Sequence, residues 1–254
     1  MKQNIKRVLM ASFMIFGCFS QNPVLAEGAD EQIDEKIAYL TYDDGPTTGI
    51  TEELLDILKK EGVKATFFVV GKEIIDKEHI LKRMHDEGHT IGLHTYSHDY
   101  KKVYSSPQIF IDEMKQTQET INKALGEEVV ANFIRFPGGS AGKLTPEFYD
   151  IIKANGYTIF DWNVSIEDGI NPRYSPYELL ENAKKPLDKQ TVRIILAHCN
   201  LTNKNTCIAT PQIIAYYKGL GYTFDTITND TPEYYFKYRQ PTEQKQTTTQ
   251  QFRL

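Results

Sequence analysis

The feature of this sequence that most constrains its fold is an alternation of short, strand-like runs with helical segments, which extends from Lys36 to Ile227. The strand-like runs are rich in Val, Ile, Phe and Tyr, and several are apolar throughout, as is typical of strands covered on both faces. Seven such runs lie at 36–42, 65–70, 90–93, 132–135, 157–163, 192–197 and 222–227. This alternation predicts one α/β domain with a mainly parallel sheet, either a barrel or an open, doubly wound sheet.

Several of the intervening segments carry signals for the starts and ends of helices. Apolar residues recur at helical spacing from Ile50 to Leu58, and the helical pattern at 107–125 stops before Gly126. Thr145-Pro146 and Thr210-Pro211 each place a capping hydroxyl directly before a proline, which is typical of a first helical turn. We therefore expect helices to begin at both prolines.

The first 26 residues have the features of a secretory signal peptide: a basic start, a short apolar run and the small-residue site Val24-Leu25-Ala26. The apolar run, about a dozen residues, is shorter than the ~20 that span a bilayer. We therefore predict a signal peptide at 1–26, a linker at 27–35, the folded domain at 36–238 and a polar, disordered tail at 239–254. The protein would be secreted, either extracellular or associated with the cell wall.

Two alternatives remain open for the first segment. It could stay uncleaved as a membrane anchor, or Ile15-Phe16-Gly17-Cys18 could serve as a lipoprotein cleavage box, although Phe16 fits that pattern poorly. Cleavage after Ala26 would remove Cys18 and leave Cys199 and Cys207 in the exported protein. In an oxidising compartment these two cysteines could form a disulfide, or both could remain free thiols.

Polar and titratable residues are concentrated directly after the predicted strands. Barrels and open parallel sheets both place their active sites at this edge. The residues in question are 41–46 after the first strand, 94–98 after the third, 135–140 after the fourth, Trp162 and Asp168 with the fifth, and His198 after the sixth. The sequence therefore predicts a site built from the ends of several strands.

The spacing of two histidines indicates a metal site. His94 and His98 are four residues apart, which puts both imidazoles on one face of a helical turn. Taken singly, these could be surface histidines, and Asp43-Asp44 could be a simple turn. When the two histidines are considered together with the two aspartates, one carboxylate can complete a set of metal ligands, and the other remains free to act as a base. The set would hold one divalent metal ion, with zinc favoured for hydrolysis and Co, Mn, Ni or Fe as alternatives.

Three motifs resemble those of a known family. They are Thr41-Tyr42-Asp43-Asp44-Gly45-Pro46, His94-Thr95-Tyr96-Ser97-His98 and Arg135-Phe136-Pro137. From about Lys36 to Ile227 the chain resembles the polysaccharide deacetylases with a NodB-homology domain, carbohydrate esterase family four. The resemblance implies a distorted, incomplete (β/α) barrel of about seven parallel strands. It also implies metal-dependent removal of acetyl groups from glycans.

The resemblance implies roles for the residues around the metal. Asp44, His94 and His98 match the metal ligands of the family. Asp43 matches the general base, and Arg135 matches the arginine that pairs with this base. Such an arginine would hold the carboxylate ionised and correctly aimed, so that it can accept a proton from the attacking water.

Further residues match the proton donor and the substrate site. His198 matches the general acid that protonates the departing amine, and Asp168 matches the aspartate that orients it, a better fit than the nearby Asp161. The backbone N–H of one glycine matches the donor that stabilises the oxyanion. The residues matched to the substrate and oxyanion site are Pro137, Gly138 and Trp162.

Some positions depart from the family pattern. Gly138 and Gly139 stand where many members have an aromatic residue, so one wall of the groove should be thinner. Gly169 stands where a tryptophan is common, which should remove a flank of the acetyl pocket. Cys199 and Asn200 follow the proposed acid where an acidic residue is frequent. None of these changes removes a metal ligand or a proton carrier.

These features predict a secreted, monomeric hydrolase of linear amides that removes N-acetyl groups from peptidoglycan GlcNAc or MurNAc. The form Gly138-Gly139-Ser140 resembles members that act on bacterial cell-wall glycan. The alternatives are a deacetylase of chitin oligomers or acetyl-xylan, another metal hydrolase such as an amidase or phosphoesterase, and a non-catalytic glycan-binding relative. The net charge of −5 argues against nucleic acid as a partner, and a membrane would be a partner only if the signal segment is retained.

Overall fold

The computed structural model describes residues 35–185 and 190–236, so the predicted signal peptide, nearly all of the linker and the tail lie outside the described residues. The described strands form one sheet in the order β5-β4-β3-β2-β1-β7-β6, with β8 beside β1, and every pairing is parallel. The strands are β1 (Ile37–Asp43), β2 (Thr66–Val69), β3 (Thr90–Leu93), β4 (Phe133–Ile134), β5 (Thr158–Ile159), β6 (Val164–Ser165), β7 (Val192–His198) and β8 (Thr223–Asp225).

The sheet is curled and incomplete, which confirms the predicted distorted (β/α) barrel. One edge of β1 pairs with β7 from Ile37 to Asp43. Its other edge is shared, because β8 pairs with residues 37–39 and β2 with residues 41–43. Strands β8 and β2 therefore follow one another along the same edge of β1, and the sheet is interrupted between them.

The predicted strand at 157–163 is wrong in its extent, and the difference explains how the barrel closes. It contains β5, which pairs with β4, and it ends before β6, which pairs with β7 at the opposite edge of the sheet. The short segment 160–163 thus joins the two edges. Since such a segment spans at most roughly 14 Å, the two edges must lie close together.

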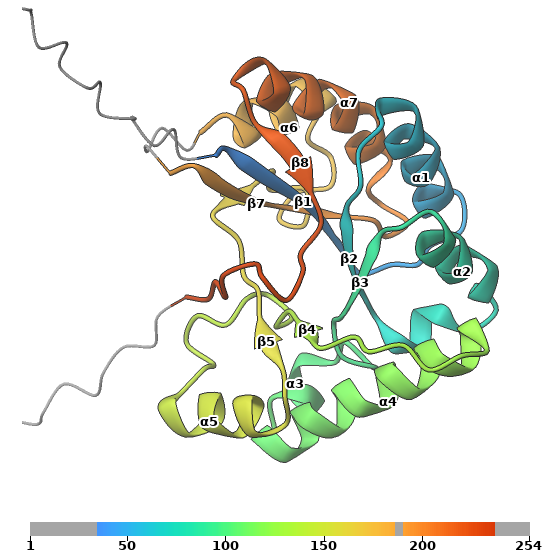
Figure 1. Cartoon of the computed structure of the whole chain (residues 1–254), viewed down its shortest axis with the longest axis vertical. Coiled ribbons are helices and arrows are strands. Elements are labelled where there is room, and N and C mark those ends of the chain that lie inside the picture. Colours follow the sequence, from blue (N-terminus) through green and yellow to red (C-terminus); the bar gives the residue numbers. More distant parts are fainter. Residues whose placement is uncertain (1–34, 186–189, 237–254) are drawn as a thin grey trace, which may run out of the picture. The chain divides into compact units, whose positions relative to one another are not determined.

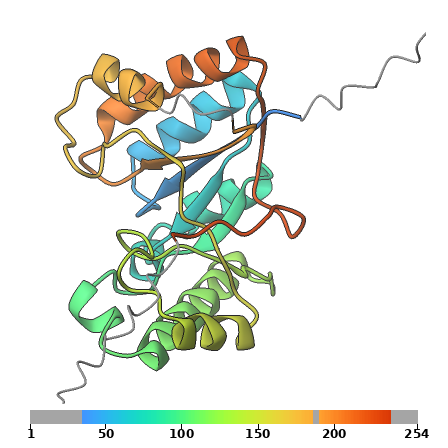
Figure 2. The same ribbon diagram turned by 90° about the vertical axis from the view of Figure 1, so that its left-hand side faces the viewer.

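Helices cover the outer side of the strands (Figure 1). The view in Figure 2 shows the strands between two groups of helices. The helical elements are α1 (Ile50–Glu61), the short 3₁₀ helix η1 (Gly71–Ile74), α2 (Glu78–Asp86), α3 (Tyr100–Val103), α4 (Pro107–Leu125), α5 (Pro146–Ala154), α6 (Pro176–Ala183) and α7 (Lys204–Gly219). Helix α4 has the predicted bounds because its ends are set by local signals, a Ser106 cap before a proline and a left-handed Gly126.

The predicted helix start at Thr210-Pro211 is wrong. Helix α7 begins at Lys204, and Pro211 lies in its interior. The Thr210 hydroxyl does not cap a helix but donates to the carbonyl of Thr206, one turn earlier. The proline removes one backbone donor, yet the helix continues because residues on both sides of it are buried against the rest of the domain.

Alternation along β1 separates two apolar layers. Ala38, Leu40 and Tyr42 point outward into the large cluster beneath the helices. Tyr39, Thr41 and Asp43 point to the other face. There an inner cluster is formed by Tyr39, Phe68, Phe133, Phe160, Ile194 and Ile227. The inner face thus changes from apolar to polar toward the carboxyl ends of the strands, where Asp43 lies.

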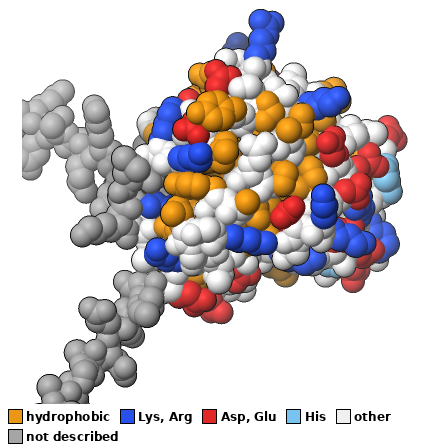
Figure 3. Space-filling view, turned by 90° about the horizontal axis from the view of Figure 1, so that it is seen from above, with side chains coloured by type: hydrophobic (Ala, Val, Ile, Leu, Met, Phe, Trp, Pro, Cys, Tyr) orange, Lys and Arg blue, Asp and Glu red, His pale blue; other side chains and the backbone are white. Residues whose placement is uncertain are grey.

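The surface seen from above carries basic and acidic side chains interspersed with hydrophobic ones (Figure 3). Within residues 35–185 and 190–236, no helix has both the length and the apolar character required to span a membrane.

Candidate active site

The site begins at the carboxyl end of β1, where two neighbouring aspartates are turned apart. Asp43 ends the strand and is buried, on the same inner face as Thr41. Asp44 has a left-handed backbone with φ of 75°. A non-glycine residue seldom adopts this conformation, and it often marks a functional position. The two carboxylates therefore have different surroundings and can serve different purposes.

Asp43 is paired with a fully buried arginine. The Arg135 guanidinium donates from Nη1 to Asp43 Oδ1 at 2.9 Å and to Thr41 Oγ1 at 2.7 Å. It also donates to the carbonyl oxygens of Phe160 and Asp161, at 2.7 and 3.2 Å. Its carbon Cζ lies 4.1 Å from the centroid of the Phe68 ring, which forms the floor beneath it. These contacts hold the cation in one orientation, and its hydrogen bond in turn fixes the direction of the Asp43 carboxylate.

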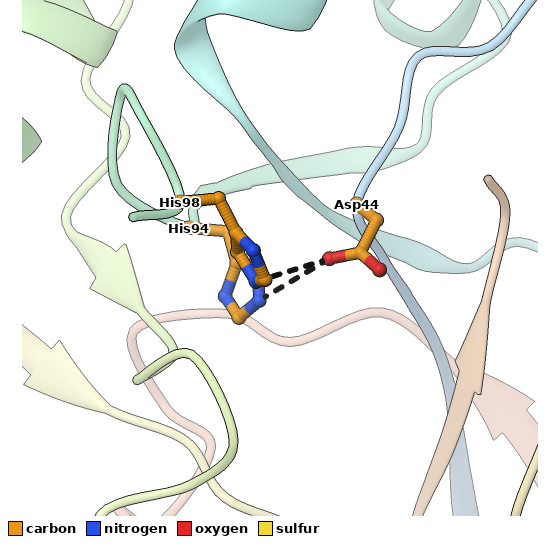
Figure 4. A group of neighbouring side chains, drawn as sticks. All are labelled: Asp44, His94 and His98. Atoms are coloured by element: carbon orange, nitrogen blue, oxygen red, sulfur yellow. Dashed lines mark ion pairs between the residues drawn. The ribbon is translucent and has the colours of Figure 1, made fainter. Parts of the chain in front are cut away.

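Three side chains converge beside this pair, as Figure 4 shows. Asp44 Oδ1 lies 3.6 Å from His94 Nε2 and 3.3 Å from His98 Nε2. Ligand atoms about 2.0–2.2 Å from a tetrahedrally coordinated ion are separated by roughly 3.3–3.6 Å. The three ligand atoms all lie within 4.8 Å of one another, and they fit a single metal ion.

The protonation of the two imidazoles also suits a metal ion. His94 Nδ1 lies 2.9 Å from the Arg135 carbonyl oxygen, so it donates there and leaves Nε2 free as a ligand. Burial and the nearby His94 lower the pKa of His98 to about 4, which keeps this imidazole neutral. Burial alone would raise the pKa of Asp44, but the neighbouring imidazoles and the Asn200 amide outweigh it, and the pKa is lowered. The carboxylate is therefore ionised.

The two histidines are brought together by a loop and not, as their spacing suggested, by a helical turn. Residues 94–98 have no helical structure, and Thr95 and His98 have positive φ values of 67° and 52°. The buried Glu113 of α4 accepts hydrogen bonds from the N–H groups of Tyr96 and Ser97, at 2.9 and 2.6 Å. Glu113 is not among the residues that the sequence predicts for the site. The available signal was an acidic residue among the buried apolar positions of α4.

The structure places Asp168, and not Asp161, against His198. Asp168 Oδ1 accepts from His198 Nδ1 at 2.7 Å, while Oδ2 accepts from the His198 N–H at 2.8 Å and the Thr206 hydroxyl at 2.7 Å. Burial alone would lower the pKa of His198, but Asp168 and the carboxylates of Asp43 and Asp44 raise it to about 9. Asp161 instead accepts from Ser140 and from the Phe236 N–H.

His198 and Asp43 lie side by side at one end of the sheet. Each is the last residue of its strand, and the two are register partners of the parallel pair β1 and β7. Both line a cavity of about 430 Å³ that also contains the three candidate ligands. The predicted acid, the predicted base and the three candidate metal ligands thus line one cavity.

Of the three residues predicted for the substrate and oxyanion site, two line the cavity and one lies behind its lining. Gly138 and Trp162 line the cavity. Pro137 does not contribute to this lining; it is buried, and its carbonyl accepts a hydrogen bond from Tyr104 at 2.8 Å. Pro137 therefore shapes the turn before Gly138 and makes no direct wall for a substrate.

Asn200 is a second residue that sequence reasoning did not assign to the site. Its Nδ2 donates to Asp44 Oδ2 at 3.1 Å, and its Oδ1 accepts from the N–H and hydroxyl of Thr202, at 3.0 and 2.6 Å. The two Thr202 donors fix the orientation of the amide, so its donor must face the carboxylate. Asp44 Oδ2 is thereby occupied, while Oδ1 faces the histidines.

Asn200→Ala should weaken the binding of Zn²⁺ by about 10- to 100-fold, the usual effect of removing a group that orients a metal ligand. The measurement is a competition titration of metal-free protein with a chromophoric chelator. The matched control is Asn205→Ala, because the Asn205 amide donates to the Tyr174 carbonyl and makes no contact with a candidate ligand. Equal affinity in Asn200→Ala and the unchanged protein would contradict this role.

The two cysteines do not form a disulfide. Cys199 and Cys207 are both buried free thiols. The Cys199 thiol donates to the Asp43 carbonyl at 3.3 Å, and the Cys207 thiol donates to the Ile50 carbonyl at 3.7 Å. Of the two alternatives that the sequence leaves open, the described structure has the two free thiols.

Comparisons with known proteins agree with this geometry. Residues 30–160 match the family described as polysaccharide deacetylase. The chain is 31% identical over 203 residues to a peptidoglycan-N-acetylglucosamine deacetylase of Bacillus cereus, covering 76% of this chain and 69% of the relative. It is 30% identical over 194 residues to a peptidoglycan-N-acetylmuramic acid deacetylase of Bacillus subtilis, covering 76% and 70%. The crystal structure of a Bacillus cereus polysaccharide deacetylase superposes with a TM-score of 0.71 at 28% identity, covering 78% of this chain and 95% of that one.

Proposed function

The chain belongs to the polysaccharide deacetylase family, and we propose that it hydrolyses N-acetyl groups of peptidoglycan amino sugars, GlcNAc or MurNAc, and releases acetate. One observation carries the proposal. Asp43 and His198, a base and an acid, are register partners that line the same cavity as Asp44, His94 and His98. A module that only bound glycans would need neither proton carrier. The amino-terminal sequence supports export as a further part of the proposal, so that the enzyme would meet its substrate outside the cell.

Asp44, His94 and His98 would hold the metal ion of the reaction. A divalent cation, with zinc favoured because hydrolysis needs no redox chemistry, would polarise the acetyl carbonyl and lower the pKa of a water molecule. The neutral imidazole of His98 and the ionised carboxylate of Asp44 are the protonation states that such an ion requires.

Asp43 would accept the proton of the attacking water. Its Oδ1 is bound to Arg135, while Oδ2 faces the metal-ligand group, 3.7 Å from His94 Nε2. One oxygen is thus anchored and the other is directed to the place where water would be activated. The buried arginine fixes this orientation, so that the free oxygen stays directed at the water from which it would take a proton.

His198 would protonate the departing amine. Its Nδ1 donates to Asp168, so Nε2 is the nitrogen left for proton transfer to the substrate. The raised pKa keeps the imidazole protonated at neutral pH, as an acid must be. The backbone N–H of Gly138 would stabilise the oxyanion, and Trp162 would form part of the wall around the acetyl group.

Acetate release is the direct test. Purified peptidoglycan, chitin oligomers and acetylated xylan are incubated in parallel with the metal-loaded protein, with and without a chelator. We expect acetate from peptidoglycan, and loss of that release with chelator. Faster release from chitin oligomers or acetyl-xylan would move the assignment to those substrates. No acetate from any of the three would contradict the proposed function and favour a non-catalytic glycan-binding protein.

Gly169→Ala should reduce acetate release by about 10²-fold, because a displacement of roughly 1 Å at a catalytic group has this cost. A Cβ at this position would lie 2.8 Å from His198 Nε2 and 2.9 Å from Nδ1, and closer still to the carbon between them. The sequence predicted a lost flank of the pocket here, but the glycine makes room for the catalytic imidazole. Gly219→Ala is the control, since nothing lies within 4 Å of that position. Wild-type rates in Gly169→Ala would show that His198 does not need this space.

A further inference from the structure

An aromatic side chain from another part of the chain fills the space that Gly138 leaves empty. The sequence predicted a thinner groove wall at this glycine. In the structure, a Cβ at Gly138 would lie 2.8 Å from the Tyr100 hydroxyl oxygen and 3.1 Å from the ring carbon Cε1. Tyr100 is the first residue of α3, directly after the histidine loop and the Asp99 cap of that helix. The wall is therefore present, but α3 supplies it.

The Tyr100 ring is held by its neighbours and yet remains about half exposed. It packs edge-on against His98, with ring centroids 5.4 Å apart at 88°, and against Tyr104, at 6.0 Å and 69°. The Lys143 ammonium lies 5.9 Å from the ring centroid and also donates to the Gly138 carbonyl at 3.0 Å. Tyr100 is nevertheless 48% exposed, and it lines the cavity together with Gly138 and Trp162.

The Tyr100 hydroxyl is available to a ligand. No hydrogen bond joins it to any of residues 35–185 or 190–236 in the described structure, although Tyr100 lines the cavity beside Gly138. An aromatic ring with an unused hydroxyl at its edge suits a sugar, whose C–H groups pack on the ring and whose oxygens accept hydrogen bonds. The hydroxyl lies beside Gly138, whose N–H we assign to the acetyl oxygen, so it borders the place that the acetylated sugar would take.

We propose that Tyr100 is a specificity-determining residue that binds the acetylated sugar, with its ring against the sugar and its hydroxyl donating to a sugar oxygen. The inference rests on the proposed function, because it takes the same cavity as the substrate site. Tyr100 acts on binding and moves no proton in the reaction. Its removal should therefore raise KM and leave kcat nearly unchanged.

The chain offers a direct optical probe of this binding. Trp162 is the single tryptophan of the sequence, and it lines the same cavity. Its fluorescence can be followed during titration with an N-acetylglucosamine oligomer, in an Asp43→Asn background in which we expect turnover to be at least about 10²-fold slower. Tyr100→Phe removes only the hydroxyl, and we expect Kd to rise about 3- to 10-fold, the effect of one hydrogen bond. Tyr100→Ala also removes the ring, and we expect Kd to rise at least about 10-fold.

Three controls separate this role from damage to the site. Metal content is measured for each variant, because Tyr100 touches His98. Tyr177→Phe and Tyr177→Ala alter an exposed tyrosine of α6, which is 67% exposed and outside the cavity lining, and neither should change Kd. Steady-state kinetics of Tyr100→Phe with Asp43 intact should show the change in KM.

The outcomes are distinct. Unchanged Kd in both Tyr100 variants, a fall in kcat with unchanged KM, or an Asp43→Asn parent that binds no oligomer would each overturn the proposal. Oligomer binding that depends on Tyr100, in a protein whose wild type releases no acetate, would support the sugar site and reject only the proposed hydrolysis. Failure of the two proposals is therefore distinguishable.

Discussion

Asp43→Asn is expected to retain the metal ion and to lose at least about 10²–10⁴-fold in acetate release, the contribution of a general base. The amide has nearly the same shape as the carboxylate, and its oxygen can still accept the hydrogen bond from Arg135 Nη1. It cannot accept a proton from water. Metal content by elemental analysis, measured beside acetate release, separates binding from chemistry.

Asp44→Ala is the matched comparison, since the two aspartates are adjacent in the chain. Asp44 Oδ1 is the oxygen nearest to both imidazoles, so its loss should remove metal and activity together. An Asp43→Asn protein with near-normal turnover would refute the base assignment. An Asp43→Asn protein that lost its metal would mean that both carboxylates are ligands.

The parts of the fold that could be predicted are those with local signals. Helix α4 begins after Ser106 and ends at Gly126 because a cap and a left-handed glycine act within one turn. The division between β5 and β6 has no such signal, since which neighbour each strand pairs with is a tertiary property. The position of Pro211 inside a helix could not be predicted either. The helix continues through the proline because the burial of its other residues outweighs the cost of the missing backbone donor, and burial is a tertiary property.

In the candidate site too, some residues could be predicted from the sequence and others depend on tertiary contacts. The convergence of the candidate ligands, base and acid could be predicted because they stand at or just after the ends of strands that the parallel sheet brings to one edge. The contributions of Glu113, Asn200 and Tyr100 could not be predicted. Glu113 binds the loop between the two histidines, and each of the other two contacts a candidate ligand. Glutamate, asparagine and tyrosine are ordinary residue types for a helix or a loop. Only their contacts in the folded chain connect these three residues with the site. The groove wall illustrates this, because Gly138 alone predicts a gap that Tyr100 fills.

Asp168→Asn is expected to lower turnover by about 10²–10⁴-fold and to move the alkaline limb of kcat/KM to lower pH. Asp168 Oδ2 accepts from two donors, the His198 N–H and the Thr206 hydroxyl, so the amide oxygen of the variant should take that place. The amide NH₂ would then face His198 Nδ1 and oppose its protonation. Among the groups that raise the pKa of His198 to about 9 against the effect of burial, Asp168 has the largest effect, so its loss must lower that pKa. The protonated acid would then disappear at a lower pH as the solution is made more alkaline.

Asp161→Asn is the control, since that buried aspartate accepts from Ser140 and Phe236 and has no contact with His198. A pH profile of Asp168→Asn that keeps the wild-type alkaline limb would show that another group protonates the departing amine.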